Sequence, residues 1–336
     1  MSILFSPLTI KDITLRNRIA ISPMCMYTAV EGFANDWHLV HYGSRATGGA
    51  GLIIQEATAI SEEGRISAGD LGLYKEEHIG FLQRITTFID QQGCVAGIQL
   101  AHAGRKGFMA IVAPSALSFS PDFDEPRALD GEGIQKVISD FRTAALRALQ
   151  AGYKLIEIHA AHGYLVHQFL SPLSNHRTDN YGGSFENRIR LLLEIVREIK
   201  SVWPDNLPLF VRISATDWAE GGWDVDEAVL LASILRKKGV DLIDSSSGGL
   251  VPYQKIPVGP GYQVPFAERI KAEANILTAA VGLITNGRQA EDILQKGQAD
   301  LILIARESLR DPYFALNAAK QLNEDFEWPR QYLRAK

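Results

Sequence analysis

The stretch YKLIEIHAAHGY, residues 153–164, carries the pattern that decides the fold. It begins as a short apolar run and ends in polar residues at His159, His162 and Tyr164. A helical pattern over residues 134–150 precedes it and stops at Gly152, where a glycine can adopt the left-handed conformation that ends a helix. The stretch therefore predicts a helix followed by a buried strand whose carboxyl end carries polar groups.

The same unit recurs along the chain. Candidate strands lie at residues 17–24, 51–60, 94–104, 153–164, 207–218, 240–249, 275–284 and 299–309. Their nearly continuous apolar runs are typical of parallel strands buried on both faces. Helical patterns alternate with them at residues 36–47, 78–92, 134–150, 185–202, 225–238, 265–274, 288–296 and 312–322, the first being the weakest. This alternation favours an α/β fold of the closed (β/α)₈ TIM-barrel type over an open doubly wound sheet.

No linker or low-complexity segment interrupts the alternation, so we expect a single domain over residues 1–336. Residues 2–16 indicate a hairpin that caps the bottom of the barrel. Residues 107–133 form the longest irregular stretch, rich in Pro, Ser and Asp. Because this stretch is too long for a plain connector, we expect a functional loop or lid.

Composition excludes several classes of protein. The chain is 46% hydrophobic and 22% charged, and it has no apolar run of the roughly 18 residues that a membrane helix requires. Its formal net charge of -5 without a basic block argues against nucleic-acid binding. The amino terminus lacks a signal-peptide pattern, and two cysteines, Cys25 and Cys94, are too few for a disulfide framework. We expect a cytoplasmic protein that binds small molecules or other protein chains.

The active site of a TIM barrel lies at the carboxyl ends of its strands, so the residues that close each apolar run are the candidates. They are Ser22, Pro23, Met24, Cys25 and Tyr27, then Ala57, Gln99, His159, His162, Tyr164 and Arg212, and finally Gly282, Ala305 and Arg306. The last three follow the final two strands, where barrels commonly bind phosphate through backbone N–H groups.

These residue types suit a large planar phosphorylated cofactor. Gln99 can match a ring edge that both donates and accepts hydrogen bonds, and Arg212 can stabilise an anion on that ring. A buried arginine needs either an anionic ligand or a carboxylate partner, and we favour the ligand. His159 and His162 can both donate to one substrate oxygen while Tyr164 supplies a proton. The two histidines can alternatively bind zinc, but no third ligand completes a motif, and we expect no metal.

Five segments match signatures of one family in order and spacing. They are LRNRI at 15–19, HAGRK at 102–106, HAAHGYL at 159–165, FLSPLSNHRTDNYGGSFENR at 169–188 and ADLILIAR at 299–306. Through them the chain resembles, nearly end to end, the old yellow enzyme family of FMN-dependent ene-reductases. The cysteine in SPMCMY, residues 22–27, is similar to that of the thermophilic-type bacterial subclass, which includes NADPH dehydrogenases and xenobiotic reductases.

The resemblance implies a role for each candidate. It implies tightly but non-covalently bound FMN, held by Ser22, Pro23, Met24, Cys25, Ala57, Gln99, Arg212, Gly282, Ala305 and Arg306, with Cys25 tuning the flavin potential. Tyr27, His159 and His162 would contact substrate, and Tyr164 would donate the proton. Arg334, in QYLRA, resembles the arginine that this subclass inserts into the active site of a neighbouring subunit, which implies a homodimer or homotetramer.

The implied reaction is reduction of the C=C bond of α,β-unsaturated carbonyl or nitro compounds in two half-reactions. NADPH, or NADH, reduces the flavin, and hydride then passes from flavin N5 to the alkene while Tyr164 protonates the neighbouring carbon. Two departures stand out: Ala305 replaces the usual glycine, which would be strained if that position needed a positive φ, and the loop after HAGRK is short.

Three alternatives remain. The chain can be a dienoyl-CoA-type reductase that lacks its iron–sulfur domain, which its two cysteines disfavour. It can be a Schiff-base lyase, but Lys106 lies beyond the end of its strand and is poorly placed for that role. The third alternative is not an enzyme but a non-catalytic flavin-binding or sensor protein.

Overall fold

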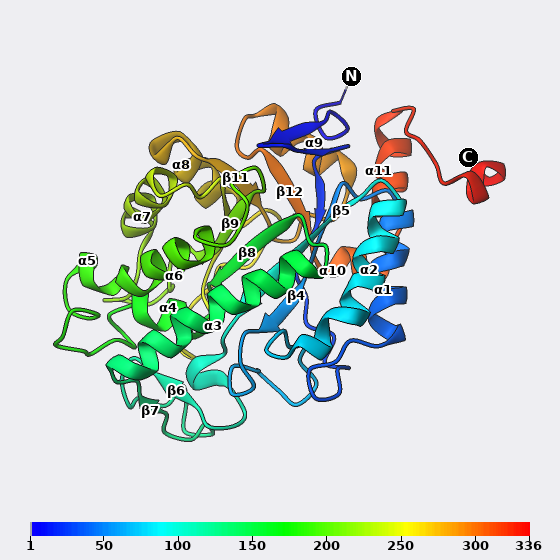
Figure 1. The fold of residues 1–336 in the computed structure, drawn as a ribbon. Coiled ribbons are helices and arrows are strands. Elements are labelled where there is room, and N and C mark those ends of the chain that lie inside the picture. Colours follow the sequence, from blue (N-terminus) through cyan, green and yellow to red (C-terminus); the bar gives the residue numbers. More distant parts are fainter. Residues whose placement is uncertain (1) are drawn as a thin grey trace.

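The computed structural model describes residues 2–336 and contains a closed barrel of eight parallel strands (Figure 1). Around the barrel they are β3 (Ile19–Ile21), β4 (Leu52–Ala59), β5 (Val95–Ala101), β8 (Leu155–Ala160), β9 (Leu209–Ser214), β10 (Leu242–Ser246), β11 (Leu277–Ala280) and β12 (Leu301–Ile304). Strand β12 pairs with β3 and closes the ring. The predicted TIM barrel is confirmed.

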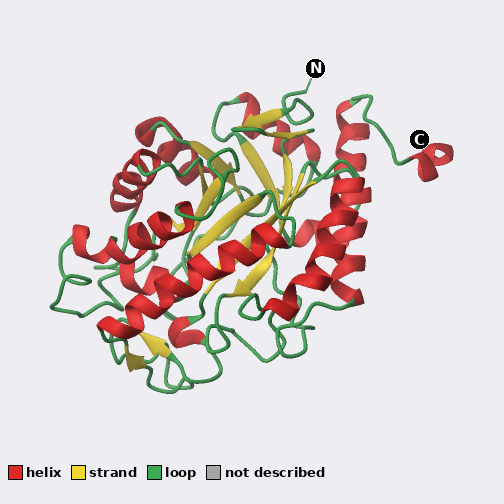
Figure 2. Cartoon of the chain, in the orientation of Figure 1, coloured by secondary structure: helices red, strands yellow, loops and turns green. Residues whose placement is uncertain are grey.

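Helices follow the strands and form an outer layer, as Figure 2 shows. They are α1 (Asp36–Thr47), α2 (Ile79–Gln91), α3 (Gly131–Gln150), α5 (Phe185–Arg188), α6 (Arg190–Lys200), α7 (Val225–Lys237), α8 (Val264–Ala274), α9 (Gly287–Gln295) and α11 (Phe314–Leu322). Asn35 and Asp224 cap α1 and α7, because each side chain accepts a hydrogen bond from a free N–H in the first turn.

Some elements differ from the sequence prediction. The single helix predicted over residues 185–202 is divided into α5 and α6, because the turn opens at Ile189, where ψ is -11°. Helix α3 begins three residues earlier than predicted, since Asp130 caps it. Short elements also occur in the loops: the turns η1 (Glu76–His78) and η2 (Gly104–Lys106), and the helices α4 (Leu165–Leu170) and α10 (Arg306–Arg310).

The two ends of the barrel carry different structures (Figure 1). At the amino ends of the strands, β1 (Leu8–Ile10) and β2 (Ile13–Leu15) form the predicted hairpin. Its apolar side chains, such as Leu15, pack on inward-facing barrel residues that include Leu155 and Phe210. At the opposite end, β6 (Val112–Ala113) and β7 (Arg127–Ala128) pair within the long predicted loop. The hairpin closes the bottom, so the open end of the barrel is the one with the loops.

The chain continues after α11 as a tail, residues 323–336, that ends in the turn η3 (Arg330–Ala335) at the edge of the molecule (Figure 1). The tail contacts the body through Phe326, whose ring lies 5.1 Å from the Phe5 ring, and through Tyr332, whose ring lies 5.9 Å from the Tyr313 ring. Within residues 2–336, every helix is too short or too polar to cross a membrane.

Candidate active site

The strand register brings the predicted residues to one end of the barrel. His159 on β8 lies beside Arg212 on β9, and Gln99 on β5 lies beside Glu157 on β8. These side chains form a polar layer above the apolar cluster at the bottom of the barrel. The carboxyl ends of the strands are therefore where a polar ligand can be bound, as in other TIM barrels.

Arg212 is almost entirely buried and has partners on two strands. Its Nε lies 3.0 Å from Asp244 Oδ2, and its Nη1 donates to Ser22 Oγ at 3.3 Å. Arg212 and Asp244 are side by side in the register of β9 and β10, which explains their pairing. Asp244 is thus a carboxylate partner of Arg212. From the sequence we favour an anionic ligand over such a carboxylate partner.

Arg212 also lines a cavity of about 160 Å³ together with Gly282, Ala305 and Arg306. The cavity wall at Gly282 has little room for a side chain. The φ of Gly282 is 128°, and a Cβ at this position would lie 3.2 Å from the Tyr262 ring. The Arg306 guanidinium beside Gly282, which carries no side chain, suits the phosphate group of FMN, and Arg212, which lines the same cavity from the barrel interior, suits an anionic edge of its ring. The residues present therefore suit the cofactor that the sequence implies.

The replacement of glycine by Ala305 places no side chain at a positive φ. Ala305 has a φ of -99°, outside the left-handed region that favours glycine. The strain expected for alanine at a positive φ therefore does not arise at this position, which directly precedes α10.

Three aromatic rings form a compact cluster at the carboxyl end of β8 and in the loop that follows it. The His159 ring lies 5.2 Å from the His162 ring and 5.0 Å from the Tyr164 ring, with near-perpendicular planes in both pairs. Ala161 N–H donates to His159 Nδ1 at 3.3 Å, so the neutral ring carries its proton on Nε2. His162 Nε2 is hydrogen-bonded to Ser246 Oγ at 2.7 Å. The cluster offers N–H and O–H donors close together.

Burial fixes the protonation of this cluster. Burial, with the nearby Arg212 charge second, lowers the pKa of both His159 and His162 well below the usual value. Burial raises the pKa of Tyr164 above its ordinary value of 10. At neutral pH the histidines therefore donate as neutral imidazoles, and Tyr164 holds its proton.

The loop that carries His162 and Tyr164 is held against the loop after β10. Gly163 has a φ of 73°, and a Cβ there would lie 2.1 Å from Gly249 O. His162 N–H donates to Ser214 Oγ at 2.9 Å. Only glycine at position 163 allows this approach, which fixes the rings relative to the barrel.

Lys106 is a site residue that the sequence analysis assigns no role. Its Nζ donates to His162 O at 2.9 Å and to Gly249 O at 3.2 Å, and it lies 4.9 Å from the Tyr164 ring centroid. Burial lowers the pKa of Lys106 to about 8. Lys106 lies beyond the end of its strand, and for that reason the sequence gives it no role. The turn η2 nevertheless folds Lys106 back over the mouth of the barrel and into the site.

The segment after β3 is fixed by a buried carboxyl group. Met26 N–H donates to Glu56 Oε2 at 2.7 Å, and Tyr42 OH donates to Glu56 Oε1 at 2.8 Å. Burial raises the pKa of Glu56 to about 7. Burial also raises the pKa of the Cys25 thiol, with Glu56 and Asp70 adding to the effect, so Cys25 is a thiol.

The remaining predicted residues surround this segment. Cys25 lies against the backbone of Ala57 and beside the half-exposed Tyr27, whose φ is 54°. Pro23 and Met24 are half-buried between Ser22 and Cys25. Arg334 is the exception: it is exposed in the projecting tail and does not join the site of its own chain.

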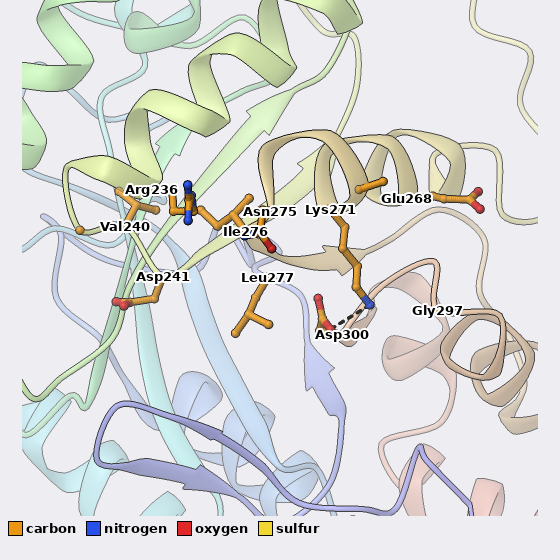
Figure 3. Close-up of a pocket in the computed structure, with 12 residues that line it drawn as sticks. Arg236, Val240, Asp241, Glu268, Lys271, Asn275, Ile276, Leu277, Gly297 and Asp300 are labelled. Carbon is orange, nitrogen blue, oxygen red and sulfur yellow. Dashed lines mark ion pairs between the residues drawn. The ribbon is translucent and has the colours of Figure 1, made fainter.

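A larger cavity, of about 750 Å³, lies at the other end of the barrel (Figure 3). Arg236, Asp241, Lys271 and Asp300 are among its lining residues, and Lys271 pairs with Asp300 at 2.9 Å. None of the predicted site residues lines it, and it lies at the amino ends of β10 and β11, the end that TIM barrels use for stability. We therefore assign the candidate site to the carboxyl ends of the strands. Within residues 2–336, no three His, Cys, Asp or Glu side chains are grouped as metal ligands.

Residues 3–325 match the model of the NADH:flavin oxidoreductase / NADH oxidase family. An NADPH dehydrogenase of Listeria monocytogenes serotype 4b (strain CLIP80459) is 53% identical over 339 residues, which cover 100% of this chain and 99% of that protein. An NADPH dehydrogenase of Bacillus subtilis (strain 168) is 53% identical over 335 residues, 98% of each chain.

Solved structures share the fold. Morphinone reductase superimposes with a TM-score of 0.83 at 28% identity, over 98% of this chain and 91% of that chain. A 2-naphthoyl-CoA reductase in complex with 2-naphthoyl-CoA gives a TM-score of 0.89 at 26% identity, over 96% of this chain but 52% of that chain.

Proposed function

The chain belongs to the NADH:flavin oxidoreductase / NADH oxidase family, and we propose that it reduces the C=C bond of α,β-unsaturated carbonyl or nitro compounds. It is a flavin-dependent enzyme of the NADPH dehydrogenase type, with FMN as cofactor and a reduced nicotinamide as reductant. The observation that carries the substrate class is the cluster in which the His159 ring lies 5.2 Å from the His162 ring and 5.0 Å from the Tyr164 ring. Because His162 Nε2 is hydrogen-bonded to Ser246 Oγ, we assign the substrate contact of His162 to its Nδ1–H.

The residues proposed to hold FMN lie in the carboxyl-terminal parts of barrel strands or in the segments that directly follow them. They are Ser22, Pro23, Met24, Cys25, Ala57, Gln99, Arg212, Gly282, Ala305 and Arg306. Bound FMN supplies hydride chemistry, whereas the barrel supplies orientation and electrostatics. Arg306 and the wall at Gly282 support the phosphate position, and the Arg212 guanidinium supports the position of the ring.

His159 and His162 are proposed to bind the carbonyl or nitro oxygen of the substrate. As the β-carbon gains hydride, negative charge develops on this oxygen, and positioned N–H donors stabilise it. Each such donor typically contributes about 10²- to 10³-fold in rate. Because both rings are neutral, they donate without placing a second buried positive charge beside Arg212.

Tyr164 is proposed to deliver the proton to the α-carbon. A positioned acid contributes about 10²- to 10⁴-fold. Its O–H stays protonated because of burial, and Lys106 against the ring face fixes the direction of the side chain. Tyr27, which lies next to Cys25 and is exposed at the mouth, is proposed to contact the substrate.

The substrate class is tested by product analysis under anaerobic conditions. The purified protein, FMN and NADPH are mixed with 2-cyclohexenone, and we expect one cyclohexanone for each NADPH consumed. A protein that binds FMN but forms no cyclohexanone, and none of the saturated product from a nitroalkene, contradicts the proposal. That outcome would favour the non-catalytic flavin-binding alternative.

A further inference from the structure

Four polar side chains lie inside the barrel beneath the proposed ring position, on four adjacent strands. They are Gln99, Glu157, Arg212 and Asp244, and each is at most 5% exposed. The register places Gln99 beside Glu157 and Arg212 beside Asp244. This interior layer adjoins the His159, His162 and Tyr164 cluster, since His159 lies beside Arg212 in the register, but the proposed reaction gives its two carboxyl groups no task.

The contacts form one chain across the barrel. Gln99 Nε2 donates to Glu157 Oε1 at 2.8 Å, and Arg212 Nε lies 3.0 Å from Asp244 Oδ2. Between these two pairs, the carboxyl groups of Glu157 and Asp244 face each other within hydrogen-bonding reach. Neither Glu157 Oε2 nor Asp244 Oδ1 receives a hydrogen bond from any donor in residues 2–336.

Two carboxyl groups can hydrogen-bond to each other only when one of them holds a proton. Ionising both would place two negative charges together in a buried site that contains one positive charge, Arg212. Burial raises the pKa of both groups, strongly for Glu157, while Arg212 favours the ionised form of Asp244. The arrangement is therefore Arg212 cation, Asp244 carboxylate and protonated Glu157, with neutral Gln99 at the end.

We propose that Glu157 and Asp244 are positioning residues that share one proton and set the reduction potential of the bound FMN. The ionised member of the pair offsets the Arg212 charge beneath the ring, and the protonated member orients the Gln99 amide. This inference rests on FMN binding at the proposed site, but not on the identity of the alkene substrate.

The pair predicts a specific pattern in the midpoint potential of bound FMN, measured anaerobically by equilibration with a reference dye. Glu157→Gln and Asp244→Asn each leave one carboxyl group that can take the single negative charge. We therefore expect each single variant to change the ratio of reduced to oxidised FMN affinity by less than about threefold. The double variant leaves Arg212 unopposed and should favour reduced FMN by about tenfold or more, which is about 30 mV for a two-electron couple.

The inference is wrong if the effects of the two substitutions on the midpoint potential are additive. Two independently ionised carboxylates would give a clear shift in each single variant and the sum of both in the double variant. No shift in the double variant would also overturn it. Asp300→Asn is the matched control, since Asp300 is a buried carboxylate paired with Lys271 at the far end of the barrel, and we expect an unchanged potential.

Infrared spectroscopy keeps the inference testable if the double variant does not fold. The difference spectrum between the wild type and either single variant should show loss of one protonated carboxyl band, because the remaining group is ionised. Retention of that band in Glu157→Gln and in Asp244→Asn contradicts a shared proton. If the potentials follow the expected pattern while no alkene is reduced, the proposed function fails and this inference stands. A wild-type protein that does not bind FMN overturns both.

Discussion

At the level of single residues, burial decides which groups can donate protons. His159, His162 and Tyr164 end an apolar run, so the sequence already indicates them as candidates. Glu157 and Asp244 lie within the apolar runs LIEIHA and LIDSS, where a sequence does not reveal that two carboxyl groups on different strands face each other. Their contact depends on barrel closure and strand register, which only the structure provides.

Replacing Tyr164 by Phe tests the proposed proton donor. We expect the rate of alkene reduction to fall by about 10²- to 10⁴-fold, because the acid is lost. Reduction of the flavin by NADPH should be unchanged, since that step needs no proton from Tyr164. Stopped-flow measurement of the two half-reactions separates them, with Tyr313→Phe, at a half-buried tyrosine beside Tyr332, as the control. Equal losses in both half-reactions would rule out this role.

Glu56 gives a prediction for the pH dependence of stability. Its pKa is about 7 in the folded protein, whereas an unperturbed glutamate has a pKa of 4.5, so the folded state binds more protons between these two values. The free energy of unfolding therefore falls as pH rises through this window, by about 3 kcal/mol in total from this group. Well above pH 7, Glu56 causes no further decrease in the free energy of unfolding.

In Glu56→Gln this contribution disappears. Chemical denaturation at about pH 5 and about pH 8 should show a smaller difference in stability for the variant than for the wild type, by about 2.5 kcal/mol, because part of the change lies below pH 5. Identical pH dependence of the two proteins would show that Glu56 has an ordinary pKa in the folded state.

At the level of elements, the strands and the long helices are predictable because their apolar periodicity is strong. The predicted helix over residues 36–47 matches α1, and all eight strands are found. The short helices α4 and α10 are not predictable in this way, because five or six residues carry too little periodicity and tertiary contacts hold them. The packing of the loop at Gly163 on Gly249 likewise has no signal in a single sequence beyond the two glycines.

Gly163→Ala tests that packing. Gly163 and Gly183 both have positive φ, 73° and 80°, so alanine costs roughly 1–3 kcal/mol of backbone strain at either position. At Gly183 nothing lies within 4 Å of the added Cβ, whereas at Gly163 it would meet Gly249 O. Thermal or chemical unfolding should therefore show Gly163→Ala to be less stable than Gly183→Ala by about 1–3 kcal/mol. Equal stabilities would mean that the two loops are not in close contact.

At the level of the whole molecule, the closed barrel and its hairpin cap follow from the alternation of strands and helices. The single-domain boundary at residues 1–336 and the homo-oligomer remain predictions. The contacts within one chain do not explain the end of the tail, because Tyr332 and Leu333 remain exposed there although the Tyr332 ring lies beside Tyr313. A neighbouring subunit would cover the Tyr332 and Leu333 side chains if Arg334 reaches the active site of that subunit.

Arg334→Ala tests this assembly. If Arg334 donates to the substrate in a neighbouring site, its loss should raise the KM for the alkene by about tenfold, the value of one charge-assisted hydrogen bond. Arg330→Ala, in the same turn, serves as the control. Sedimentation analysis should show a dimer or a tetramer. A monomer with unchanged KM in Arg334→Ala would contradict the assembly.

The central claim is that the carboxyl end of this barrel binds FMN and uses it for turnover. The most direct measurement is the visible absorption spectrum of the purified protein under anaerobic conditions. We predict a yellow protein that NADPH bleaches and that 2-cyclohexenone restores to yellow. A protein that stays colourless after incubation with FMN, or one whose flavin absorption NADPH does not change, would contradict the account.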